Sequence, residues 1–240
     1  MLKQTVLITG ANKSIGFETA RRLGELGYKV WMGSRDLARG ETAAQLLRDM
    51  GQDIQVLQID TASDDSVKAA AERVQREDGR LDVLINNAAI LGDMSAPSEM
   101  QLSTIKAVYE VNVFGPIRTT QAFLPLLKAS AHANIVMVSS GLGSLHSLSD
   151  PDNEFASVNI LGYNSSKSAL NAVMLSFAKE LADTGIRVNA ADPGYTKTDF
   201  NHHRGYRTVE QAAEIIVRLA TLDQDGVTGG YFDENGSIPW

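Results

Sequence analysis

The sequence contains no cysteine among its 240 residues. This absence excludes disulfide bonds, thiolate metal sites and a cysteine nucleophile. It is also compatible with a reducing compartment, and we expect a cytoplasmic location. A chain of this length fits one large α/β domain, so we expect residues 1–240 to form a single domain around one core.

The sequence also lacks basic blocks and long apolar runs. Its 22 Lys and Arg residues are outnumbered by 29 Asp and Glu residues, for a net charge of −7. This balance disfavours a polyanion, so we expect no nucleic-acid partner. No stretch reaches the roughly 18 apolar residues of a membrane span, and the opening MLKQTVLITG predicts neither a signal peptide nor a membrane segment. A small-molecule substrate fits this composition better.

What is present is a regular alternation of strand-like and helix-like segments, the pattern of a parallel sheet with helices on both faces. We therefore expect an α/β fold with a Rossmann-type, doubly wound sheet of seven parallel strands. The predicted strands are 5–9, 28–33, 54–59, 82–85, 134–139, 186–191 and 230–232, and the predicted helices are 14–26, 37–50, 64–76, 102–128, 163–183 and 208–222.

Two stretches, 141–162 and 195–207, fit no regular element, and each directly follows a predicted strand. Ligands of open α/β sheets bind outside the carboxyl ends of the strands. Long loops at those ends are where functional contacts are expected. We therefore predict that both stretches contact the substrate.

The first predicted strand runs into a glycine loop with the sequence TGANKSIG. Glycine lets a chain turn tightly and lets backbone N–H groups approach a pyrophosphate at a helix N-terminus. A plain strand-to-helix turn is the alternative. The loop resembles the TGxxxGxG motif of the short-chain dehydrogenase/reductase family, which implies a bound nicotinamide dinucleotide. The candidate cofactor-binding residues here are Gly10, Asn12, Lys13, Ser14, Ile15 and Gly16.

Ser14 replaces the middle glycine of the family motif. Serine costs little there if its φ is negative, and about 1–3 kcal/mol if the loop demands an unusual backbone conformation. Its hydroxyl offers a compensating bond to a phosphate oxygen.

The residues after the second strand bear on the choice between NADP(H) and NAD(H). Ser34 stands where NAD-using relatives tend to carry Asp, and Arg35 follows it. An acid at this place binds the ribose hydroxyls, whereas a base attracts a 2′-phosphate. Together with Lys13, Arg35 favours NADP(H). The alternatives are that both cations are solvated surface charges, or that Asp36 turns inward and favours NAD(H).

The resemblance extends to further candidate cofactor contacts. Each set follows a predicted strand, and each has a plainer interpretation as a turn or a helix cap. The sets are Asp60 and Thr61 for the adenine, Asn87, Ala88 and Ala89 in the NNAA segment, and Pro193, Gly194, Thr196 and Thr198 near the nicotinamide.

The most specific pattern is Tyr163 followed by Lys167, a YxxxK match. Positions i and i+4 share one face of a helix, so a phenol and an ammonium lie close together. A nearby cation lowers the pKa of a phenol, which is near 10 in water. An exposed helix pair is the alternative. The resemblance makes Tyr163 the proton donor and makes Lys167 the residue that lowers its pKa and holds the nicotinamide ribose.

Two further residues complete the catalytic set that the resemblance implies. Ser140, in NIVMVSSG, matches the serine that hydrogen-bonds the substrate oxygen. Asn112, in YEVNVFGP, matches the asparagine that interrupts the fourth helix and holds a water linked to the lysine. A polar helix residue with local hydrogen bonds is the alternative for Asn112.

The resemblance covers essentially the whole chain and implies hydride transfer between NADPH and a small ketone, aldehyde or quinone, or the reverse alcohol oxidation. The long segment between Ser140 and Tyr163 resembles that of carbonyl reductases. The alternatives are a 3-oxoacyl carrier-protein reductase, an inactive NADP(H) sensor and a structural scaffold. Both a monomer and a homo-oligomer fit. We expect His146, His202 and His203 to be loop residues and not metal ligands.

Overall fold

The protein is described here by a computed structural model that covers residues 3–240. The strands are β1 (Thr5–Ile8), β2 (Lys29–Ser34), β3 (Ile54–Gln58), β4 (Val83–Asn86), β5 (Ala133–Val138), β6 (Ile186–Ala191) and β7 (Tyr231–Phe232). The helices are α1 (Ser14–Glu25), α2 (Leu37–Arg48), α3 (Asp64–Glu77), α4 (Leu102–Tyr109), α5 (Gly115–Lys128), α6 (Leu145–Ser149), α7 (Leu161–Glu180) and α8 (Val209–Ala220).

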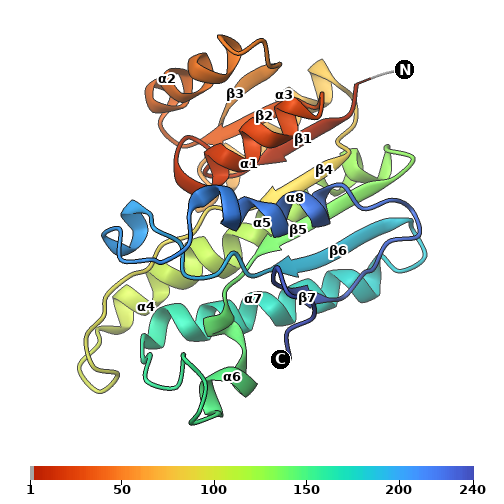
Figure 1. Cartoon of the computed structure of the whole chain (residues 1–240). Coiled ribbons are helices and arrows are strands. Elements are labelled where there is room, and N and C mark those ends of the chain that lie inside the picture. Colours follow the sequence, from red (N-terminus) through yellow and green to blue (C-terminus); the bar gives the residue numbers. More distant parts are fainter. Residues whose placement is uncertain (1–2) are drawn as a thin grey trace.

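The seven strands form one parallel sheet in the order β3-β2-β1-β4-β5-β6-β7 (Figure 1). This doubly wound sheet confirms the fold that the sequence predicted. The strand order reverses between β1 and β4, and in such sheets the crevice at the carboxyl ends of the strands is where ligands bind.

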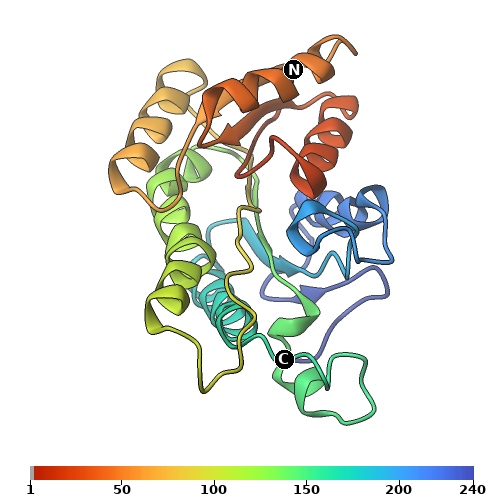
Figure 2. The same ribbon diagram turned by 90° about the vertical axis from the view of Figure 1, so that its left-hand side faces the viewer.

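Helices cover both faces of the sheet, with α1, α2 and α8 on one side and α3, α5 and α7 on the other (Figure 2). Successive residues of β1 alternate between the two layers, since Val6 packs with the first group and Leu7 with the second. Both are fully buried. The strands therefore have apolar residues on both faces, as a parallel sheet between two helical layers requires.

The helix predicted over 102–128 is interrupted in the structure. A π-helical turn, Glu110–Phe114, separates α4 from α5. Proline lacks an N–H, and its ring clashes with the carbonyl four residues earlier. For Pro116 that carbonyl belongs to Asn112, so the regular α-helical bond cannot form there and the turn widens.

The stretch 141–162 is more ordered than predicted. It contains a 3₁₀ turn at Gly141–Gly143, the short helix α6 and the start of α7 at Leu161. The Ser144 hydroxyl caps α6 by accepting the Ser147 N–H at 3.0 Å. The stretch 195–207 likewise contains a 3₁₀ turn, Asp199–Asn201.

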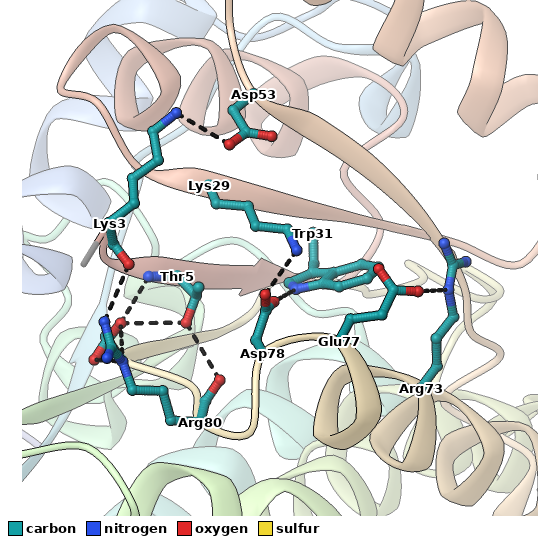
Figure 3. Close-up of polar contacts among 10 residues, drawn as sticks. Lys3, Thr5, Lys29, Trp31, Asp53, Arg73, Glu77, Asp78 and Arg80 are labelled. Carbon is teal, nitrogen blue, oxygen red and sulfur yellow. Dashed lines mark hydrogen bonds and ion pairs between the residues drawn. The ribbon is translucent and has the colours of Figure 1, made fainter.

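Trp31 anchors a polar cluster near the start of β2 (Figure 3). Its buried indole donates to Asp78 at 2.6 Å, and Lys29 pairs with the same carboxylate at 2.7 Å. The ring lies between two cations, 4.6 Å from Lys29 Nζ and 5.0 Å from Arg73 Cζ. These contacts tie β2 to α3.

Among residues 3–240, every helix is too short or too polar to span a membrane.

Candidate active site

The two outer glycines of the loop between β1 and α1, Gly10 and Gly16, stand where only glycine fits without strain. Gly10 has a φ of +65°, which favours glycine. A Cβ at Gly16 would lie 2.6 Å from Asn87 Nδ2 and 2.7 Å from Gly10 O. The loop therefore presents bare backbone at the start of α1, the environment that a pyrophosphate needs. These residues fit a dinucleotide.

Ser14, the first residue of α1, has a φ of +52°. A serine in this left-handed region carries strain of about 1–3 kcal/mol. Of the two alternatives for Ser14, a negative φ without strain and an unusual backbone conformation with strain, the structure shows the second.

The segment after β4 is held against the glycine loop. Asn87 Nδ2 donates to the carbonyls of Thr9 and Gly10 at 2.9 and 3.2 Å. The Thr9 hydroxyl accepts the N–H groups of Asn87 and Ala88, each at 3.0 Å. Two of the predicted cofactor-binding segments, Gly10–Gly16 and Asn87–Ala89, thus meet at the carboxyl ends of β1 and β4.

Arg35 and Asp36, two of the residues expected to select the cofactor, lie at the start of α2, whereas Lys13 lies in the glycine loop before α1. The Asp36 carboxylate caps this helix by accepting the Arg39 N–H at 3.0 Å, and it also lies 3.4 Å from Arg39 Nε. Asp36 is therefore occupied at the helix end. Arg35 is exposed, and Lys13 lies 3.3 Å from Asp199.

The other predicted cofactor contacts lie at neighbouring strand ends. After β3, Asp60 Oδ1 accepts the Ala62 N–H at 3.0 Å, and Thr61 is buried. After β6, the Thr196 hydroxyl donates to the Gly194 carbonyl at 3.0 Å. The other two predicted contacts in this segment are Pro193, which precedes Gly194, and Thr198, which is buried.

The structure brings Tyr163, Lys167 and Ser140 together. Tyr163 and Lys167 lie in the first half of α7, with Lys167 Nζ 5.5 Å from the centre of the Tyr163 ring. Lys167 also donates to the Val138 carbonyl, at the end of β5, at 2.7 Å. Ser140 follows that strand, and its Oγ accepts the Leu142 N–H at 3.2 Å.

Burial is the largest influence on the pKa values of Tyr163 and Lys167, and it favours the uncharged form of each. It raises the pKa of the Tyr163 phenol, an effect that the Ser140 hydroxyl partly offsets and the Asp192 carboxylate reinforces. Burial also lowers the pKa of Lys167 to about 8, against a smaller opposing effect of Asp192. Lowering of the tyrosine pKa by Lys167 stays a prediction.

Asn112 is buried within the π-helical turn, and hydrogen bonds satisfy its side chain. It exchanges two bonds with the backbone of Ile90, each 2.9 Å long. Its amide also donates to Ser166 Oγ at 3.1 Å, and Ser166 in turn donates to the Tyr163 carbonyl at 2.7 Å. Asn112 therefore joins the segment after β4 to the helix that carries Tyr163 and Lys167.

Three residues that the sequence analysis did not select also lie here. The ring of Phe200 meets Tyr163 edge-on, with centroids 5.6 Å apart. Asp192 is buried at the end of β6 and accepts the Gly194 N–H at 2.8 Å. Phe155 packs so closely on Gly141 that a Cβ there would lie 2.4 Å from its ring. Asp192 had a signal in its place directly after a strand, and Phe155 and Phe200 lie in the two stretches predicted to contact the substrate, although neither was selected individually.

A cavity of about 300 Å³ begins beside Gly141, one residue after Ser140. His146, Phe155 and Asp192 are among the residues that line it. A larger cavity of about 490 Å³, bounded by Tyr28, Asp82 and His132, lies where the strands begin. Because ligands of this fold bind at the opposite ends of the strands, we assign the functional site by its chemistry and not by cavity size.

His146 lies in the helix α6, so the prediction of a loop residue is wrong for it, and it is far in the sequence from the adjacent His202 and His203. His146 lines the cavity beside Gly141, and His203 Nε2 lies 3.0 Å from Asp199. His202 has a left-handed backbone, with a φ of +54°. Among residues 3–240, no group of three or more His, Asp or Glu residues is arranged to hold a metal ion.

Comparison with known proteins identifies the family of the chain. The family model described as short chain dehydrogenase matches residues 4–207. A short-chain dehydrogenase of Penicillium roqueforti, anuI, is 39% identical over 225 residues, which cover 91% of this chain and 89% of that protein. The (+)-neomenthol dehydrogenase of Arabidopsis thaliana is 32% identical, with 94% of each chain covered.

A solved structure, the NADPH-bound carbonyl reductase from chicken fatty liver, superposes with a TM-score of 0.88 at 27% identity and covers all of both chains. The chain belongs to the short-chain dehydrogenase family. It is thus a member of an oxidoreductase family whose relatives act on alcohol and carbonyl groups.

Proposed function

We propose that this protein transfers hydride between NADPH and the carbonyl carbon of a small ketone, aldehyde or quinone, with Tyr163 as the proton donor. The observation that carries the proposal is the convergence of Tyr163, Lys167 and Ser140, from α7 and the end of β5, at the carboxyl edge of the sheet on which the glycine loop also lies. The bound dinucleotide supplies the hydride.

The chain's own residues orient the substrate and move a proton. Leu142 N–H occupies one lone pair of Ser140 Oγ and leaves the serine's own proton available for an acceptor such as the substrate oxygen. Tyr163 gives its phenolic proton to that oxygen as negative charge develops there. Lys167 holds positive charge close to the ring and lowers the cost of the phenolate that remains. Asn112 fixes the start of α7 through Ser166.

The preference for NADP(H) is supported by the charges at the start of α2 and in the glycine loop. Asp36 caps α2 and so does not present its carboxylate to a ribose. Arg35 and Lys13 are exposed cations that suit a 2′-phosphate. Phe155 and Phe200 place apolar rings next to Gly141 and Tyr163, which supports an apolar surface for the carbon skeleton of the substrate.

The test follows nicotinamide absorbance with NADPH and NADH in the presence of benzaldehyde, cyclohexanone and menadione. NADPH-dependent turnover that disappears in Tyr163→Phe is the expected result. Tyr28→Phe is a matched control, because both phenols are 8% exposed and Tyr28 lies away from the site. Tight NADPH binding without turnover would point to a cofactor sensor. Turnover that survives in Tyr163→Phe would exclude the proposed proton donor.

A further inference from the structure

The turn that carries Ser140 from β5 to α6, residues 139–144, is held by side chains outside the proposed catalytic set. We call it the serine turn. Tyr231 of β7 donates its hydroxyl to the Ser140 carbonyl oxygen. The Gly143 N–H donates to the same oxygen at 2.7 Å. Both lone pairs of this oxygen are therefore occupied, which fixes the peptide plane next to Ser140.

Asn171 of α7 holds the serine turn on either side of Ser140. Its Oδ1 accepts the Ser139 hydroxyl at 2.6 Å, and its Nδ2 donates to the Gly143 carbonyl at 3.3 Å. Asn171 is buried, one helical turn beyond Lys167. The serine turn is thus tied both to β7 and to the helix that carries Tyr163 and Lys167.

The position of Tyr231 is itself fixed. The side chain is 1% exposed, and its ring stacks on Trp240 with centroids 5.5 Å apart and an interplanar angle of 20°. The Ser144 hydroxyl donates to the Pro239 carbonyl at 2.7 Å, and the His146 N–H donates to the Trp240 carbonyl at 2.8 Å. The end of the chain lies beside α6 in both ribbon views (Figures 1 and 2).

We propose that Tyr231 is a positioning residue that acts through Ser140. Its hydroxyl sets the backbone from which the serine side chain reaches the substrate oxygen. This inference rests on the proposed function, because it needs Ser140 to contact the reacting carbonyl. A buried phenol also needs a hydrogen-bond partner for stability alone, so the test must separate positioning from stability.

Tyr231→Phe removes the hydroxyl and keeps the ring stacked on Trp240. We expect kcat with NADPH and menadione to fall about 10- to 100-fold, since small displacements in an active site have effects of this size. The NADPH dissociation constant should not change, and amide hydrogen exchange in the serine turn should become faster. Tyr28→Phe removes a buried phenol hydroxyl at the other end of the sheet and should leave kcat and this exchange at wild-type values.

A double-mutant comparison shows whether the effect passes through Ser140. In a Ser140→Ala background, Tyr231→Phe should cause no further loss of kcat, because the group it positions is gone. The same fold loss in both backgrounds, or an unchanged kcat in Tyr231→Phe alone, would overturn the positioning role. A Ser140→Ala enzyme with wild-type kcat would instead contradict the proposed function.

Asn171→Ala gives a second route if Tyr231→Phe does not fold. It frees the serine turn at Ser139 and Gly143 and leaves the stack of Tyr231 on Trp240 in place. The expected result is again a fall in kcat and faster exchange in the serine turn, with no further loss of kcat in the Ser140→Ala background. A loss that persists undiminished without the serine hydroxyl would count against the proposal.

Discussion

Lys13 Nζ lies 3.3 Å from the carboxylate of Asp199, so one ion pair joins the glycine loop after β1 to the 3₁₀ turn after β6. Both side chains are more than half exposed, at 62% and 58%. Exposed pairs of this kind contribute about 0–1 kcal/mol, so a phosphate can displace Asp199 at little cost. Lys13 is therefore able to leave Asp199 for a phosphate, as its proposed role in NADP(H) binding requires.

Lys13→Ala is expected to weaken NADPH binding about tenfold or more, the loss of one charge-assisted hydrogen bond. NADH lacks the 2′-phosphate and should lose less. Titrations of cofactor fluorescence measure both dissociation constants. Lys68→Ala removes an exposed cation on α3 and should change neither value. Equal weakening of NADH and NADPH by Lys13→Ala would contradict a 2′-phosphate contact.

Ser14→Gly should stabilise the protein by about 1 kcal/mol, because glycine adopts the φ of +52° without strain. Urea unfolding measures the change. Ser14→Ala keeps the strained side-chain carbon and should bring no gain. If the serine hydroxyl binds a phosphate oxygen, Ser14→Gly and Ser14→Ala will weaken NADPH binding equally. A glycine variant less stable than the wild type would show that the strain is outweighed elsewhere.

Asp78→Ala should destabilise the protein by about 3–5 kcal/mol, because it leaves the buried Trp31 indole and the half-buried Lys29 ammonium without their shared partner. The control is Asp53→Ala, which breaks the exposed pair of Lys3 and Asp53 drawn in the same view (Figure 3) and should cost less than about 1 kcal/mol. Thermal unfolding measures both. Similar losses in the two variants would mean that burial does not set the cost.

The sheet order follows from features that are local in the sequence. Short β-branched runs alternate with helical periodicity, and that alternation admits few arrangements other than a doubly wound sheet. Periodicity did not predict the interruption at Glu110–Phe114, because the apolar spacing continues through it; only the resemblance of Asn112 to the family's asparagine implied a break there. It depends on a backbone clash between Pro116 and the Asn112 carbonyl, which a helical pattern does not reveal.

The contacts of the candidate site likewise include some that the sequence predicts and some that it does not. Tyr163 and Lys167 are four residues apart on one helix, so their proximity could be predicted from spacing alone. The contact of Phe200 with Tyr163 and that of Tyr231 with Ser140 join segments far apart in the chain. Such contacts depend on how β6, β7 and the loops after them pack, and no short motif encodes that packing.

Lys167 should destabilise the folded protein at neutral pH. Burial lowers its pKa from 10.5 to about 8, so the folded state disfavours the ammonium. Between these two pH values the unfolded chain keeps a proton that the folded protein has released. The free energy of unfolding therefore increases, and the protein becomes more stable, as pH rises from about 8 to 10.5.

Lys167→Met removes the buried charge and keeps a side chain of similar length. We expect the variant to be inactive yet about 1 kcal/mol more stable at neutral pH, because the cost of burying the charge exceeds that of losing the bond to the Val138 carbonyl. This advantage should shrink as pH rises above about 8, since the wild type then sheds the charge. Urea unfolding over this range measures the difference, with exposed Lys179→Met on the same helix as control. A difference independent of pH would mean that the ammonium is solvated, and Lys167 would then be free to hold its charge beside Tyr163 at every pH of the assay.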